Sequence, residues 1–167
     1  MPQNDSKLST NEILYRSSKA LKLSEEDLLQ TYKLENFPMD AKGLKSLLAR
    51  RQDKHFKACS YEELGVFLDG LVSLKRGPSP KKEEPKEALS LSNNLILKKL
   101  RIAAELKEAE TEIIFSLANI TLSKQQLSSL FRNEKHKNFK VCSDVLLLAF
   151  LDGLDEFYFS GVAEFDV

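Results

Sequence analysis

The sequence has few of the residues that build disulfide-stapled or membrane-spanning proteins. Among 167 residues there are 2 cysteines, too few for a disulfide framework. The longest unbroken apolar run, from Val145 to Leu151, is far shorter than the roughly 20 residues that cross a bilayer. The first ten residues are polar and lack the apolar stretch of a signal peptide. We therefore expect a cytoplasmic protein with reduced cysteines and no membrane contact.

The sequence also lacks an excess of charge of either sign. Lysine and arginine number 25, and aspartate and glutamate also number 25. This balance excludes a general attraction to polyanions as the main property of the chain. The apolar fraction of 42% is sufficient for a hydrophobic core, so the composition excludes wholesale disorder.

An internal repeat is the strongest pattern that is present. When the sequence is shifted by 83 residues, positions 8–71 align without a gap on positions 91–154, with 24 identities among the 64 pairs. The identities cluster: F-K-A-C-S aligns with F-K-V-C-S, and F-L-D-G-L occurs in both copies. Such clusters in one ungapped register indicate a duplicated structural unit.

The repeat defines the expected domain boundaries. The first copy spans residues 8–77 and the second spans residues 91–161, with a linker of proline, lysine and glutamate at residues 78–90. Proline-rich linkers are extended and semi-rigid. Because each copy has only about 70 residues, each is expected to be only marginally stable alone. The copies should pack on each other or on a second chain.

Each copy reads as four short helices, which makes the expected fold all-α. In the first copy the helices should begin near Ser9, Ser24, Asp40 and Ser60, where a capping residue precedes apolar positions at helical spacing. Capping-box patterns pair Ser9 with Glu12, Ser60 with Glu63 and Ser123 with Gln126, and Ser24 with Asp27 is a weaker version. No segment alternates convincingly at the period of a β-strand.

The fourth helix of each copy is the most apolar. In the second copy, Leu146, Leu147, Leu148, Phe150 and Leu151 surround the helix, so burial on every side is expected. The predicted architecture is thus a tandem repeat of two four-helix units packed around their fourth helices, related by a pseudo-twofold axis.

A repeated Asp-Gly pair lies within each fourth helix. Glycine inside a helix costs about 1 kcal/mol relative to alanine, so its presence in both copies needs a reason. We expect a close approach between helices, with a groove for a ligand or partner helix as the alternative. Each aspartate should cap a helix or pair with a basic residue, and an acid–base dyad across the pseudo-twofold axis is the alternative. The repeated structural motif comprises Cys59, Asp69, Gly70, Cys142, Asp152 and Gly153.

No combination of residues predicts catalysis. Cys59 and Cys142 directly precede predicted helices, where a helix dipole could activate a thiol, but the apolar residue before each favours structural burial. His55 could share a helical face with Cys59 as a metal ligand, yet the second copy has Asn138 at that position. Phosphate-loop, G-x-S-x-G and H-E-x-x-H motifs do not occur. We expect no catalytic residue, no metal site, no cofactor and no enzymatic activity.

A basic stretch late in the third helix of each copy, and in the loop after it, suggests an alternative function. The second and third helices resemble a helix-turn-helix pair, although their connection is longer than the usual tight turn. A solvated helix face is the simpler interpretation. If nucleic acid is bound, the expected contacts are Arg50, Arg51, Lys54, Lys57, Arg132, Lys135, Lys137 and Lys140.

The paired F-K-x-C-S and F-L-D-G-L motifs resemble those of the YehS family, bacterial proteins built from a duplicated domain of unknown function. The resemblance covers nearly the whole chain outside the linker and the first few residues. The second copy also fits the family's first-helix pattern with Ile96, Leu97, Leu100 and Arg101, whereas the first copy has Ser17 and Ser18 at the last two positions. The resemblance implies a bacterial cytosolic protein and no particular activity.

Two functions from different classes remain after these exclusions. The first is a helical protein-interaction module with a protein partner, or with a second copy of itself. The second is nucleic-acid binding through the second and third helices of each copy.

Overall fold

The computed structural model describes residues 8–77 and 91–159, and in this part of the chain helices joined by loops are present and strands are absent. The predicted linker at residues 78–90 and the last two residues of the predicted second copy lie outside the described residues. The first copy contains α1 (Thr10–Ala20), α2 (Glu25–Leu34), α3 (Ala41–Leu48) and α4 (Tyr61–Arg76). The second contains α5 (Asn93–Ala103), α6 (Glu108–Leu117), α7 (Lys124–Leu130) and α8 (Asp144–Phe159).

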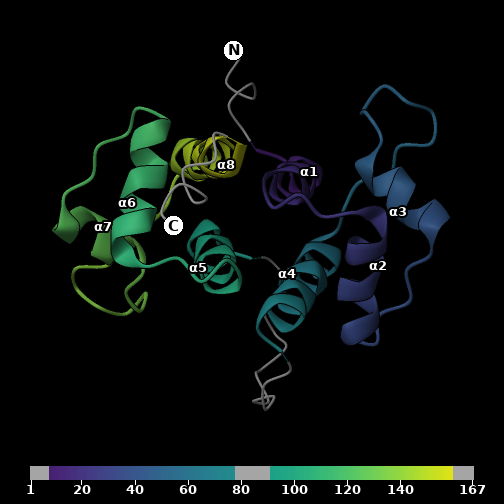
Figure 1. Ribbon diagram of the computed structural model, residues 1–167, viewed down its shortest axis with the longest axis horizontal. Helices are drawn as coiled ribbons and strands as arrows, with labels where there is room; N and C mark the ends of the chain where they lie inside the picture. Colours follow the sequence, from purple (N-terminus) through teal and green to yellow (C-terminus); the bar gives the residue numbers. More distant parts are fainter. Residues whose placement is uncertain (1–7, 78–90, 160–167) are drawn as a thin grey trace.

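Four helices form the centre of the molecule, two from each copy. Helices α1, α4, α5 and α8 lie in the middle, α2 and α3 flank them on one side, and α6 and α7 flank them on the other (Figure 1). The buried apolar residues of both copies join in a single core. The two copies are therefore one structural body, as expected for units that are only marginally stable alone.

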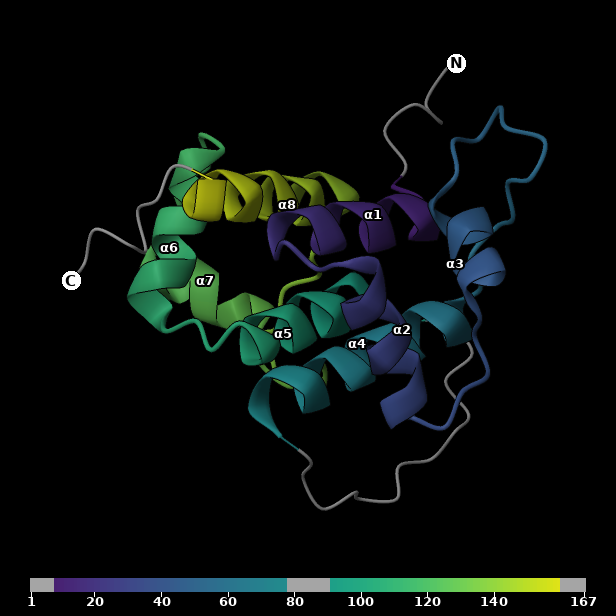
Figure 2. The same cartoon turned by 45° about the vertical axis from the view of Figure 1, so that its right-hand side comes forward.

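The four central helices all run in the same direction (Figure 2). Contacts between α1 and α8 show this directly, because their residue numbers rise together. The Leu8 N–H donates to Asp144, Arg16 contacts Asp152, and the Lys22 ammonium donates to the Tyr158 carbonyl, each pair being 136 residues apart. All four carboxyl ends consequently meet at one end of the molecule.

The fourth helices lie at the junction between the copies, but they do not mainly pack on each other. Helix α8 packs on α1 of the other copy, and α4 packs on α5. The apolar circumference of α8 is explained by three neighbours, α1, α5 and α6. Burial on every side is not complete, because α8 keeps an exposed stripe that contains Val145, Asp152 and Phe159.

The predicted helix starts of the first copy are confirmed at Ser9, Ser24, Asp40 and Ser60, each of which is an N-cap residue. The capping box is complete at Ser24 with Asp27, where the sequence pattern was weaker. At Ser9 the hydroxyl accepts the Glu12 N–H, while the Glu12 carboxylate binds the guanidinium of Arg16. The carboxylate is therefore engaged by a cation on the next turn.

Candidate functional site

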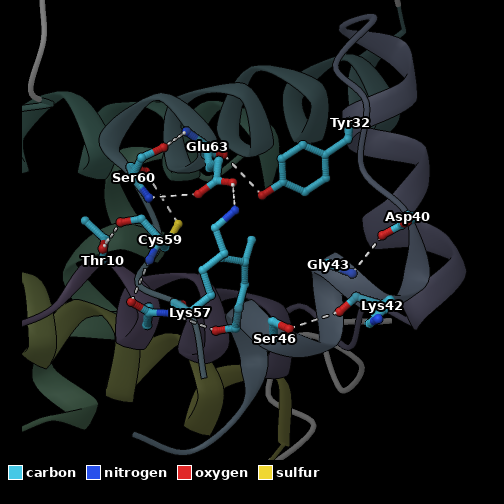
Figure 3. Close-up of polar contacts among 12 residues, drawn as sticks. Thr10, Tyr32, Asp40, Lys42, Gly43, Ser46, Lys57, Cys59, Ser60 and Glu63 are labelled. Carbon is cyan, nitrogen blue, oxygen red and sulfur yellow. Dashed lines mark hydrogen bonds and ion pairs between the residues drawn. The ribbon is translucent and has the colours of Figure 1, made fainter. Parts of the chain in front are cut away.

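The repeated F-K-x-C-S motif forms the junction between the third and fourth helices (Figure 3). The carboxylate of Glu63 accepts the Ser60 N–H at 2.9 Å and lies 3.7 Å from the ammonium of Lys57. The Tyr32 hydroxyl donates to the Glu63 carbonyl at 3.1 Å, and the Thr10 hydroxyl donates to the Cys59 carbonyl at 2.6 Å. These bonds join the start of α4 to α1 and α2.

An asparagine in the first turn of α1 holds the same junction from the other side. The Asn11 amide donates to the carbonyls of Leu47 and Lys57, and its oxygen accepts the Cys59 N–H, each at 2.9 Å. Asn94 makes the three equivalent bonds in the second copy. The identity of Asn11 and Asn94 in the 83-residue register is the one signal in the sequence that could have marked these asparagines as functional.

Both cysteines are buried in the junctions, with 6% of Cys59 and 2% of Cys142 exposed. Burial raises the pKa of each thiol from 9.0 to about 12, and the nearby carboxylates of Glu63 and Asp144 add to this effect. A thiol with such a pKa is protonated near neutral pH and is a poor nucleophile. The helix dipole does not activate these cysteines, and the arrangement points to a packing role.

The repeated glycines lie where two helices cross at very short distance. A Cβ atom on Gly70 would lie 2.6 Å from the carbonyl carbon of Thr31 in α2. A Cβ atom on Gly153 would lie 2.8 Å from the carbonyl carbon of Ile114, the equivalent residue of α6. Backbone occupies the space beside each glycine, so neither glycine opens a ligand groove at these crossings.

The aspartates beside these glycines point to the other copy and pair with basic residues. Asp69 contacts the ammonium of Lys99, and Asp152 lies 2.7 Å from the guanidinium of Arg16. Lys99 and Arg16 are themselves equivalent in the repeat. The two ion pairs are therefore related by the pseudo-twofold axis and connect α4 with α5 and α8 with α1. The dyad alternative is not supported, because each carboxylate has its own cation.

The basic stretches fold as two exposed loops at opposite ends of the molecule (Figure 1). Each loop returns along its third helix, as shown by bonds from the Lys57 N–H to the Ser46 carbonyl and from the Lys140 N–H to the Ser129 carbonyl. All eight predicted contact residues are exposed. Within the described residues, Lys57 is the one member of this set with an ion pair.

The second and third helices do not pack as a helix-turn-helix pair. Helix α2 packs mainly on α4 and has little contact with α3, while α3 packs also on α1. Six residues, from Glu35 to Asp40, separate α2 from α3. In a helix-turn-helix the two helices are joined by a turn of about 3–4 residues. Any contact with a nucleic acid would therefore be made by the basic residues of the exposed loops and not by a recognition helix.

Across 8–77 and 91–159, no three histidine, cysteine, aspartate or glutamate side chains gather in a way that could hold a metal ion. In the same ranges no helix is long and apolar enough to cross a membrane.

The two copies that contain these junctions and glycine crossings match the model of a known protein family. The family described as "Protein of unknown function (DUF1456)" matches this chain twice, at residues 10–77 and 93–158. The chain belongs to the DUF1456 family. The two matches correspond to the two helical copies, so the family's unit is the four-helix repeat, and the resemblance expected from the F-K-x-C-S and F-L-D-G-L motifs is confirmed.

A relative in the DUF1456 family shares most of the chain. It is the "Uncharacterized protein YehS" of Escherichia coli (strain K12), which is 34% identical over 149 residues. The aligned region covers 87% of this chain and 93% of the relative. No solved structure matches the chain.

Proposed function

We propose that this DUF1456 protein is a non-enzymatic, cytoplasmic protein-interaction module that binds its partner through the outer face of α6. The proposal is carried by two apolar side chains, Ile113 and Leu117, which are 41% and 36% exposed. They are four residues apart and therefore neighbours on one helix face. Helix α6 lies at the outside of the molecule (Figure 1), and the exposure of both side chains makes this face available to a partner.

The asymmetry between the copies supports this choice of surface. Six of the nine large apolar side chains that are exposed among the described residues belong to the second copy. At the position of Ile113 the first copy has Gln30. An apolar side chain at the surface is ordinary, but an adjacent pair in one copy and a polar residue in the other indicate a specialised contact. An amphipathic partner helix is the simplest occupant of such a face.

The test is affinity capture from the native cytosol with three forms of the protein. We expect the unmodified chain to retain a protein that Ile113→Gln with Leu117→Gln loses, because the apolar contact is removed. The matched control is Leu34→Gln on α2, which also removes an exposed leucine and should retain the partner. Capture that is the same for all three forms would contradict the proposal. Nucleic acid recovered without protein would favour the second candidate.

The second candidate function is nucleic-acid binding, favoured by the exposed cations of the two loops. Each contact with a phosphate releases counterions, so affinity should fall with salt with a log–log slope of about −0.9 per phosphate on duplex DNA. Replacing Arg50, Arg51 and Lys54 by alanine should weaken binding and reduce this slope by up to about three contacts. Labelled duplex and single-stranded oligonucleotides at low salt provide the assay. Failure to bind there would leave these loops as solvated surface.

A further inference from the structure

The molecule has a basic groove that neither proposed function uses. It has a volume of about 470 Å³ and lies between the carboxyl end of α4, the surface of α5 and the start of α6. This size falls in the range of sites that bind small organic molecules. Four cations line it, Arg76, Lys98, Arg101 and Lys107, against a single acid, Glu105.

The cations of this groove have no carboxylate partner among the residues that the structure describes. Like charges gathered in one groove repel each other, which makes the empty groove electrostatically unfavourable. An anion with two negative charges would relieve this repulsion.

Arg101 is held in a fixed orientation at the wall of the groove. Its guanidinium lies 4.5 Å from the centre of the Phe131 ring, and its Nε–H donates to the Leu106 carbonyl at 3.1 Å. A guanidinium has five N–H donors in a planar fork, so this bond leaves its terminal groups for another acceptor. Such a preorganised fork suits the oxygen atoms of a phosphate.

The duplication does not repeat the cations of this groove, which come from α5, from the start of α6 and, in the first copy, from the end of α4. At the positions equivalent to Lys98, Arg101 and Lys107, the first copy has Tyr15, Ser18 and Ser24. The position equivalent to Arg76 holds Phe159.

One replacement also works against helix stability. Ser24 caps α2, whereas Lys107 is the N-cap of α6 and makes no side-chain cap. An ammonium group cannot accept a backbone N–H, so a cation here gives up the side-chain cap, although the Glu110 carboxylate still accepts the Lys107 N–H at 2.8 Å.

We propose that this groove is a binding site for a phosphate monoester that carries a flat apolar group, the chemistry of a nucleoside monophosphate. The phosphate dianion lies among the ends of Arg76, Lys98, Arg101 and Lys107. The flat group lies against the apolar walls made by Ile102 and Leu106, which also line the groove.

The test uses the full chain and three probes, AMP, inorganic phosphate and adenosine, in calorimetric titrations at about 50 mM salt. We expect AMP to bind, inorganic phosphate to bind more weakly, and adenosine not to bind. Phosphate that binds as tightly as AMP would overturn the apolar part of the proposal. Absence of binding by both AMP and phosphate would overturn it entirely.

Variants of the lining residues locate the binding. Lys98 and Lys107 are exposed, so Lys98→Ala with Lys107→Ser should leave folding intact and weaken AMP binding at least about tenfold, since half of the cations are lost. Glu105→Gln removes the single acid of the groove and should strengthen binding severalfold.

The control is Lys135→Ala with Lys137→Ala in the exposed loop of the second copy, which removes the same charge and should change the affinity less than about twofold. Equal weakening by the control pair and the groove pair would mean nonspecific attraction and would overturn the proposal. Melting curves of all variants confirm that each is folded. The α6 variants that test the partner-binding proposal do not touch this groove, so the two proposals fail independently.

Discussion

At the scale of single residues, Gly70 and Gly153 determine how closely the helices of each copy approach. We expect Gly70→Ala to destabilise the protein by about 2 kcal/mol or more, because the new Cβ would overlap the backbone of Thr31 and force α2 and α4 apart. Gly153→Ala should act in the same way against Ile114. Chemical denaturation followed by circular dichroism gives the free energy of unfolding.

Gly65 in the same helix provides the matched control. A Cβ atom there would have its nearest neighbour at 3.7 Å, an ordinary contact with a Leu91 methyl group. Gly65→Ala should therefore stabilise the protein by up to about 1 kcal/mol, since alanine is the better helix former. Equal effects of the Gly65 and Gly70 substitutions would contradict the close-approach interpretation.

The buried thiols predict how stability changes in alkaline solution. The pKa of Cys59 and Cys142 is about 12 in the folded protein and 9.0 ordinarily. The unfolded chain therefore loses these protons first, so the contribution of the thiols to stability should be constant below about pH 9 and fall between about pH 9 and 12. The loss is about 1.4 kcal/mol per pH unit for each thiol.

Unfolding by denaturant at several pH values checks this prediction. The variant with Cys59→Ala and Cys142→Ala should lose stability less steeply over the same range, because the remaining alkaline loss comes from other groups such as Tyr32, whose pKa is also raised by burial. Parallel curves for the two proteins would mean that the thiols are not shielded from water.

At the scale of helices, the first helix of each copy forms its main contact with the fourth helix of the other. The ion pair of Arg16 with Asp152 tests this pairing, because its partners are about one-third and one-half exposed and connect α1 to α8. A double-mutant cycle with alanine at both positions should give a coupling of about 0.2–1 kcal/mol that weakens with added salt. Purely additive effects would argue against the direct contact.

The helices themselves could be predicted from the sequence because their signals are local. A capping residue and the apolar spacing that follows it lie within one helix, and for this reason the predicted starts at Ser9, Ser24, Asp40 and Ser60 are correct. The pairing of helices is not local. An apolar surface on α8 indicates that neighbours exist but does not identify them, so packing on α1 could not be distinguished from packing on α4.

In the candidate sites, too, the sequence marks individual residues but does not identify their distant neighbours. Asp69 and Gly70 were found because the repeat marks them, and the structure shows that they face different neighbours, Lys99 of the other copy and Thr31 of the same copy. Asn11 carries no signal beyond its identity with Asn94, since its function depends on carbonyls 36 and 46 residues away. The basic groove could not be predicted from the sequence, because α4, α5 and the residue after α7 contribute to it from distant segments.

At the scale of the whole molecule, the contact between the copies is part of the core and not a surface added to two finished domains. We expect two chains cut between residues 84 and 85 to form a stable 1:1 complex when they are produced together. Light scattering gives the mass of the complex, and circular dichroism gives its helical content and melting curve.

The separated halves are the control for the cut protein. Each half alone exposes the faces of two central helices, so we expect it to be largely unfolded or to associate with itself. A half that melts cooperatively as a monomer would show that each copy is an independent domain.

The shared direction of α1 and α8 has a consequence for synthesis of the chain. Their contacts join residues 136 positions apart. During synthesis, α1 therefore cannot form these contacts until α8, the last helix, has left the ribosome. At about 5–20 residues per second, this delay lasts roughly 7–27 seconds. During this time the side of α1 that packs on α8 has no partner within its own chain and is available to chaperones. It is also available to α8 of a neighbouring nascent chain, and exchange of copies between two chains would produce a domain-swapped dimer with the same contacts.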